Sequence, residues 1–169
     1  MVNEYIILDL ETTGLDPAND KIIEVGAVKI QDDNVVDEFS VFVNPGISIP
    51  DNISKLTGIV DSDVVDAASL DAVKPDLVDF VDTLPIVGQF ISFDMSFLYE
   101  NNIRFTNQVI DTRDLAMITL PTLSSYSLAS LVAYLDIDNT NPHKALSDAK
   151  ATADVFIKLK KLISELDIK

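Results

Sequence analysis

The chain has 169 residues, of which 47% are hydrophobic, so it is long enough for a buried core and too apolar for a disordered protein. The absence of cysteine excludes disulfides and thiolate metal sites, and it favours a reducing, cytoplasmic location. With a net charge of −16 the chain lacks the basic surface of a typical nucleic-acid-binding protein, so charge alone argues against DNA or RNA as a ligand. No apolar stretch reaches the roughly 18–20 residues that a membrane span requires.

The first part of the chain predicts three strands joined by short polar turns. They cover Tyr5–Leu10, Ile22–Ile30 and Val35–Val43, and each is rich in apolar and β-branched residues. Short connections between consecutive strands favour an antiparallel arrangement. A short helical turn is expected at Ser54–Gly58.

The remainder of the chain alternates helical and strand patterns. Leu70–Val81 has helical spacing, with Pro75 near its start or kinking it. The further segments, in chain order, are a strand at Pro85–Gln89, a helix at Met95–Asn101, a strand at Val109–Asp111, a helix that begins at Asp111, a helix at Leu128–Leu135 capped by Ser127, and a final amphipathic helix at about Ala145–Leu166. This order predicts one α/β domain over residues 1–169, with a mixed sheet covered by helices.

Two carboxylates interrupt the first predicted strand, in the run Tyr5-Ile-Ile-Leu-Asp-Leu-Glu-Thr-Thr-Gly14. Asp9 and Glu11 are residues i and i+2 of a strand, so their side chains share a face. Burying like charges together is costly unless a cation joins them, and divalent metals prefer hard oxygen ligands. The pattern therefore favours a metal site over two acids that are exposed to water.

Two more acids and the single histidine lie at the ends of predicted elements. Asp94 follows the fourth strand and begins a helix, Asp148 lies in the first turn of the last helix, and His143 precedes that helix. Ligands of α/β proteins commonly bind at such ends, so these residues could converge with the first pair on one pocket. Four carboxylates would be neutralised by two divalent cations, which suit phosphodiester hydrolysis, and an imidazole suits a general base. Taken alone, Asp94 suits a helix N-cap as well as a metal ligand.

These residues fall into three motifs. The first is Asp9-Leu-Glu-Thr-Thr-Gly-Leu15, the second is Phe93-Asp94-Met-Ser-Phe-Leu98, and the third is His143-Lys-Ala-Leu-Ser-Asp148-Ala. In this order they resemble the motifs of the DnaQ-like, or DEDDh, family of 3′–5′ exonucleases. Ile23-Glu-Val-Gly-Ala27 and the segment 49–59 also follow the family pattern, so the resemblance covers nearly the whole chain.

The resemblance implies a ribonuclease H-like fold, in which three antiparallel strands open a mixed sheet and parallel strands complete it. It also implies a two-metal mechanism with Mg²⁺ or Mn²⁺. By position in the motifs, Asp9 would bridge both metals, Glu11 and Asp148 would complete the first site, and Asp94 would hold the second. His143 would be the general base.

The resemblance also assigns the residues that follow the first strand. Thr12, Gly14 and Leu15 would line the pocket for the terminal nucleotide. One departure from the family pattern stands before the second motif, where members commonly carry His-Asn and this chain has Gln89 and Phe90. Phenylalanine lacks the polar side chain that asparagine would place beside the site, so we expect the grip on substrate or the rate to differ.

Aromatic residues around the second motif have two interpretations. Phe90, Phe93, Phe97 and Tyr99 could stack on bases, but their spacing favours the core for most of them, and none is chosen as a base reader. Asp111 is expected to cap its helix rather than to bind a metal.

The leading hypothesis is a metal-dependent 3′–5′ exonuclease that acts on single-stranded or frayed 3′ ends of DNA and releases nucleoside 5′-monophosphates, in proofreading, repair or end trimming. RNA or short oligoribonucleotides are the alternative substrate, because contacts with a 2′-hydroxyl would distinguish RNA from DNA and no residue of the sequence indicates such a contact. A less favoured alternative is an accessory module with residual metal binding. Because so acidic a chain should bind free nucleic acid weakly, a polymerase, helicase or integrase partner is expected to deliver the strand end.

Overall fold

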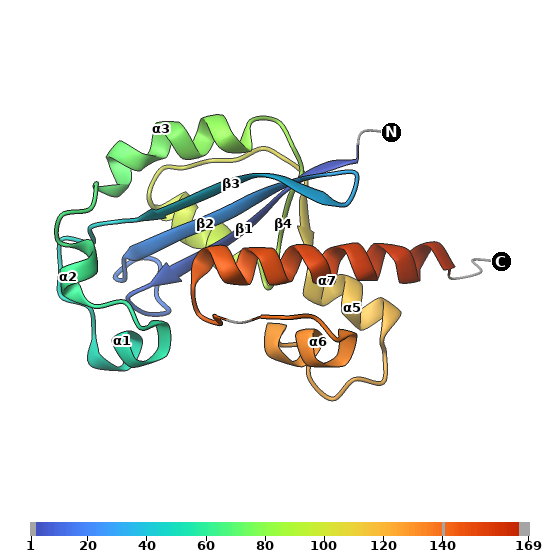
Figure 1. Ribbon diagram of the computed structural model, residues 1–169. Helices are drawn as coiled ribbons and strands as arrows, with labels where there is room; N and C mark the ends of the chain where they lie inside the picture. Colours follow the sequence, from blue (N-terminus) through green and yellow to red (C-terminus); the bar gives the residue numbers. More distant parts are fainter. Residues whose placement is uncertain (1–2, 140, 166–169) are drawn as a thin grey trace.

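Five strands form one mixed sheet at the centre of the structure (Figure 1), a computed structural model that describes residues 3–139 and 141–165. The strands are β1 (Glu4–Thr12), β2 (Ile22–Gln31), β3 (Asn34–Phe42), β4 (Ile86–Gly88) and β5 (Val109–Asp111). Their order across the sheet is β3-β2-β1-β4-β5. The pairs among β1, β2 and β3 are antiparallel, and β4 and β5 continue from β1 in parallel, so the predicted mixed sheet is confirmed.

Helices cover both faces of this sheet. They are α1 (Asp51–Thr57), α2 (Asp61–Val64), α3 (Leu70–Val81), α4 (Ser92–Glu100), α5 (Thr112–Thr119), α6 (Leu128–Leu135) and α7 (Ala145–Glu165). The core of one face includes α3 and α4, whereas α7 runs along the other face, and α5 and α6 pack against α7 (Figure 1). None of the described helices is both long and apolar enough to cross a bilayer.

Several helix boundaries differ from those predicted. α4 begins at Ser92 rather than at Met95, because contacts from a distant carboxylate, described below, fix its start in place of a local cap. α1 is longer than the predicted turn, and the four-residue α2 is too short for its periodicity to be recognised. Pro75 lies inside α3, so its predicted position near the start of the helix is wrong, and the alternative, a kink at Pro75, stays a prediction. Leu166, the predicted end of the last helix, lies outside the described residues.

The alternation of β1 divides its side chains between the two faces of the sheet. Even-numbered residues such as Leu8 belong to the core beneath α3 and α4. Tyr5 and Ile7 point the other way and pack with Phe156 of α7. Asp9 and Glu11 take the next two positions on this α7 face, so the acids share the side of the sheet on which α7 lies.

The first turn of α7 approaches β2 at Gly26, the residue that pairs with Asp9 across the sheet. A Cβ at Gly26 would lie 2.2 Å from the backbone carbon of Ala145 and 2.2 Å from the backbone nitrogen of Leu146. No side chain fits that space, so only glycine permits this close approach. The beginning of α7 therefore lies next to Asp9.

We expect the substitution Gly26→Ala to lower the free energy of unfolding by about 3 kcal/mol, because the backbone of α7 has to move away from β2. Thermal unfolding followed by circular dichroism should show a fall in melting temperature of roughly 6–12 °C. Gly46→Ala is the matched control. Its φ of 69° makes alanine strained, but nothing lies within 4 Å of the added Cβ, so the loss should be about 1 kcal/mol. Equal losses in the two variants would contradict this account.

Candidate active site

Asp94 reaches β1 from the first turn of α4 and binds between the two acids of that strand. Its side chain is 4% exposed, and its Oδ1 accepts the backbone N–H of Leu10 at 2.9 Å. Leu10 stands between Asp9 and Glu11, at a level where β4 has already ended at Gly88. The structure thus brings Asp94 beside both acids of the first motif.

Both oxygens of the Asp148 carboxylate accept hydrogen bonds, which fix this side chain in the first turn of α7. The backbone N–H of His143 donates to Oδ2 at 3.0 Å, and the side-chain amide of Asn139 donates to Oδ1 at 2.8 Å. Asn139 is held in turn by Ser147, whose hydroxyl donates to its Oδ1 at 2.9 Å. Asn139 is not among the predicted site residues, because a polar residue in a polar loop gives no sequence signal of such a contact.

Glu11, His143 and Asp148 form a group of possible metal ligands. One ligand atom from each lies within 4.8 Å of those from the other two. His143 is exposed, and its φ of 62° places its backbone in the left-handed region at the entrance to α7. With Asp9 and Asp94 adjoining, β1, α4 and the start of α7 bring four acids and one imidazole together. Carboxylate oxygens are the ligands that Mg²⁺ and Mn²⁺ prefer, so the arrangement can hold such cations.

Burial and mutual repulsion raise the pKa values of three of these carboxyls. Burial, and then the charges of Asp94 and Glu11, raise the pKa of Asp9 well above its ordinary value. Burial, and then the charge of Asp148, raise the pKa of Glu11 to about 8. Burial also raises the pKa of Asp94 to about 8, against the opposing effect of its backbone hydrogen bonds. The ionised cluster is therefore unfavourable at neutral pH unless a cation joins it.

A further carboxylate, that of Glu24 in β2, binds the N-terminal end of α7. Its side chain is 5% exposed and accepts the backbone N–H of Ala145 at 3.0 Å. Burial raises the pKa of Glu24, and the hydrogen bond from Ala145 opposes that shift. Glu24 is not among the predicted site residues, although an acid inside an otherwise apolar strand was a signal that could have found it.

The last residue of β1, Thr12, and the turn after it, with Gly14 and Leu15, contain the three residues that the first motif is predicted to place against the substrate. The hydroxyl of the buried Thr12 donates to the carbonyl of Gly14 at 2.6 Å. The carboxylate of Asp20 lies where a Cβ of Gly14 would stand, with its nearest oxygen 2.3 Å from that position. Leu15 is 83% exposed. Internal contacts therefore hold the turn and leave the Leu15 side chain presented to solvent.

Gln89 and Phe90, which replace the usual His-Asn pair, make different contacts from each other. The Gln89 side chain donates to the carbonyl of Tyr126 at 2.7 Å and accepts from the hydroxyl of Thr112 at 2.6 Å. It therefore ties the end of β4 to α5 and to the loop before α6. The Phe90 ring is 50% exposed.

The predictions for the other residues near the second motif are partly correct. Phe93 and Phe97 belong to the core, whereas Phe90 and Tyr99 are 50% and 55% exposed, so the expectation that most are buried is wrong for half of them. Asp111 caps α5, as predicted, because its carboxylate accepts the backbone N–H of Arg113, the second residue of the helix, at 2.9 Å.

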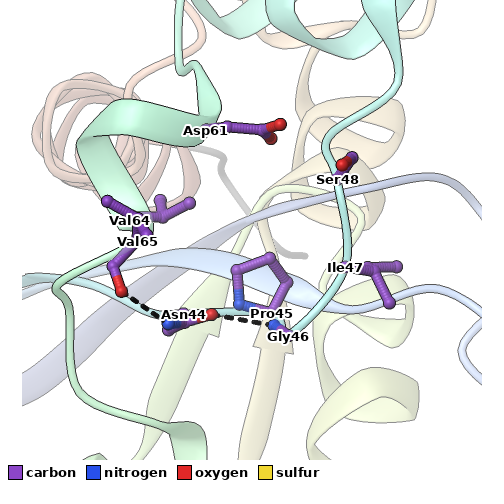
Figure 2. A pocket seen from close by; sticks show the side chains of 8 residues that line it. All are labelled: Asn44, Pro45, Gly46, Ile47, Ser48, Asp61, Val64 and Val65. Carbon is purple, nitrogen blue, oxygen red and sulfur yellow. Dashed lines mark hydrogen bonds between the residues drawn. The ribbon is translucent and has the colours of Figure 1, made fainter.

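A cavity of about 370 Å³ lies in the loop between β3 and α1, beside α2 (Figure 2). The side chain of Asn44 donates to the carbonyl of Val65 at 2.8 Å and accepts the N–H of Gly46 at 2.9 Å (Figure 2). Neither the four acids nor His143 line this cavity, so it is separate from the candidate site.

Comparison with known proteins identifies relatives over almost the whole chain. The family model RNase_T, described as Exonuclease, matches residues 6–156. The chain is 34% identical over 160 residues to DNA polymerase III subunit epsilon of Aquifex aeolicus, covering 92% of the chain and 79% of that relative. It is 39% identical over 170 residues to DNA polymerase III PolC-type of Caldanaerobacter subterraneus subsp. tengcongensis, covering 98% of the chain but 12% of that relative.

Solved structures share the arrangement of the sheet and helices. Exonuclease X in complex with 5′ overhanging duplex DNA has a TM-score of 0.80 and 25% identity, covering 93% of this chain and 91% of that one. The nuclease domain of 3′hExo, described as a DEDDh family member and bound to rAMP, has a TM-score of 0.83 and 21% identity, covering 95% of this chain and 92% of that one. At 21% identity, the similarity to the 3′hExo domain is evidence of the fold alone.

We expect the metal-free protein to lose stability as the pH rises from about 6 to about 9. In this window ordinary carboxyls are already ionised in both states. The pKa values of Glu11 and Asp94, each raised to about 8, mean that the folded state keeps protons that the unfolded chain has released until the pH passes about 8, and the pKa of Asp9 is shifted in the same direction. The free energy of unfolding therefore falls as the pH rises, and the melting temperature should drop by about 5 °C or more.

Addition of Mg²⁺ or Mn²⁺ should reverse most of this fall, because a cation can take the place of the protons. Glu11→Gln should make the pH dependence shallower, whereas Glu100→Gln, at an exposed position at the end of α4, should leave it unchanged. A melting temperature that is constant across the window in the wild type would contradict the raised pKa values.

Proposed function

The chain belongs to the DnaQ-like, or DEDDh, family of 3′–5′ exonucleases, and we propose that it hydrolyses phosphodiester bonds at single-stranded or frayed 3′ ends of DNA, releasing nucleoside 5′-monophosphates. The observation that carries the proposal is the convergence of Asp9, Glu11, Asp94, Asp148 and His143 at the start of α7. The four carboxylates of this cluster, of which Asp94 and Asp148 are buried and the other two half-buried, repel one another when ionised and destabilise the fold, so a purely structural role is disfavoured.

Two divalent cations, Mg²⁺ or Mn²⁺, fit the donor set of this site. Four carboxylates balance the charge of two such ions. Burial, followed by the charge of Asp148, raises the pKa of Glu11 to about 8, and a bound cation would favour its ionised form. Asp9 would bridge the two ions, Glu11 and Asp148 would complete one site, and Asp94 would complete the other. When bound, the pair supplies activation of the attacking water and stabilisation of the leaving oxygen.

His143 is the proposed general base. Its exposed side chain lies at the rim of the carboxylate group, where it can reach a water and return the proton to solvent. Its backbone N–H is bonded to Asp148, so the same contact that fixes a ligand also fixes the base. Imidazole is well suited to accept a proton near neutral pH.

The turn after β1 is the proposed contact for the terminal nucleotide. The exposed Leu15 side chain offers an apolar surface to the base, and the backbone of Thr12 to Gly14, held by its internal hydrogen bond, offers polar groups to the sugar. These contacts are independent of base identity, as removal of successive nucleotides requires.

Relatives at 34–39% identity are DNA polymerase III proteins, which supports DNA as the substrate and proofreading as the role. The chain spans 12% of the length of the PolC-type relative from Caldanaerobacter subterraneus subsp. tengcongensis. We propose a polymerase as the partner that presents the strand end, because a chain with a net charge of −16 repels free polyanions.

A time course on 5′-labelled single-stranded DNA tests this function. The wild type should produce a ladder that descends from the 3′ end with Mg²⁺ or Mn²⁺ and none with a chelator. Asp9→Ala should lower the rate by roughly a thousandfold or more, because it removes the bridging ligand. Glu100→Ala is the control at an exposed position. RNA of matched sequence should be degraded more slowly. An inert wild type in both metals, or a ladder that survives Asp9→Ala, would refute the proposal.

Asn139 provides a test of how the site is assembled. Loss of its hydrogen bond in Asn139→Ala frees one oxygen of Asp148, and we expect the Mn²⁺ concentration for half-maximal activity to rise about tenfold or more. Asn141→Ala changes an exposed asparagine of the same loop and should have no such effect. Calorimetric titration with Mn²⁺ should report the same difference without substrate. Identical Mn²⁺ affinities in the two variants would exclude a positioning role for Asn139.

A further inference from the structure

Phe90 has an unusual backbone for an aromatic residue. Its φ of 56° lies in the left-handed region, which side chains with a Cβ adopt only under strain and bulky ones rarely. Its ring is nevertheless 50% exposed, so burial in the core does not compensate for the strain. Residues held in such conformations cluster at functional sites, where the surrounding structure fixes them.

The carboxylate of Asp111 is what fixes this turn. It accepts the backbone N–H of Phe90 at 3.0 Å, that of Ile91 at 3.1 Å and that of Arg113 at 2.9 Å. One side chain therefore holds Phe90, from the turn after β4, next to Arg113, from the first turn of α5. The guanidinium carbon of Arg113 lies 5.2 Å from the centre of the Phe90 ring.

These two side chains line a groove of about 570 Å³, which we call the Phe90 groove and which consists of Gln89, Phe90, Arg113 and residues 124–128. Three of the residues that line it are serines, so hydroxyl groups accompany the ring and the guanidinium. The groove begins where β4 ends beside β1. A Cβ at Gly88 would lie 3.0 Å from the carbonyl oxygen of Leu8, the residue before Asp9, and the carbonyl of Phe90 accepts the N–H of Phe93, the residue before Asp94.

Arg113 is an available positive charge in an acidic protein. The two ion pairs among residues 3–139 and 141–165 use Lys150 and Lys160, not Arg113. An exposed aromatic face beside a guanidinium and hydroxyl groups has the chemistry that grips single-stranded nucleic acid, through stacking on a base and contact with a phosphate. Stacking is tolerant of sequence and does not depend on net charge, so it suits a chain whose overall field repels the substrate.

We propose that the Phe90 groove binds the single-stranded DNA segment that leads to the 3′-terminal nucleotide, with a base stacked on Phe90 and a backbone phosphate held by Arg113. The inference rests on the proposed exonuclease function and deepens it by assigning the path of the strand. Phenylalanine in place of the usual asparagine then strengthens the binding of the strand by stacking, although its backbone is strained.

Two substrates of the full chain separate this inference from the exonuclease function itself. One is a single-stranded DNA dodecamer, and the other is the p-nitrophenyl ester of thymidine 5′-monophosphate, which has no upstream nucleotide. In Phe90→Gly and in Arg113→Ala, the ratio of kcat/KM on the dodecamer to kcat/KM on the ester should fall about tenfold, through KM for the dodecamer. Phe90→Tyr should restore most of the ratio. Because glycine relieves the strain, Phe90→Gly should melt at or above the wild-type temperature, which shows that its fold is intact.

Tyr99 and Arg104 form the matched control. They repeat the same pairing, with the guanidinium carbon 4.0 Å from the ring centre, at the far end of α4 and outside the Phe90 groove. Tyr99→Ala should leave the ratio unchanged. An unchanged ratio in Phe90→Gly and Arg113→Ala would overturn the inference, even if both substrates are hydrolysed. A wild type that hydrolyses neither substrate would overturn the exonuclease proposal instead.

Discussion

The buried carboxylate of Glu24 accepts the backbone N–H of Ala145, and the position of α7 on the sheet depends on that bond. The first N–H groups of a helix have no partner within it, and a carboxylate at that end also suits the helix dipole. Gly26 lies on the same strand and lets the backbone of α7 come close. These two residues of β2 therefore determine that Asp148 and His143 meet the acids of β1, although neither needs to touch substrate.

On the face of β1 that lies under α7, the first side chains pack in the core and the next ones are the acids of the site. Tyr5 and Ile7 bury apolar surface against α7, and this packing holds Asp9 and Glu11 where burial and repulsion raise their pKa values. Hydrophobic packing elsewhere in the domain offsets the energy of that cluster. The fold thus holds the carboxylates close together. The backbone strain at Phe90, whose φ is 56°, is a second unfavourable contribution to the free energy of folding.

Local patterns were enough to predict the sheet and most helices, and they placed the acids of the three motifs on elements that the structure brings together. Strand alternation places Asp9 with Glu11, and the end of a helix places Asp148, because both depend on near neighbours in sequence. The roles of Glu24 and Asn139 depend on contacts with residues that local periodicity cannot identify. The start of α4 was missed for the same reason, since the carboxylate of Asp111 fixes it from another strand.

We propose that the converging carboxylates bind two divalent cations, and anomalous diffraction from crystals grown with Mn²⁺ and thymidine 5′-monophosphate would locate such ions. We expect two peaks about 4 Å apart, both in contact with Asp9, with Glu11 and Asp148 at one and Asp94 at the other. Absence of anomalous density between these side chains at saturating Mn²⁺, or Mn²⁺ bound only elsewhere, would contradict it.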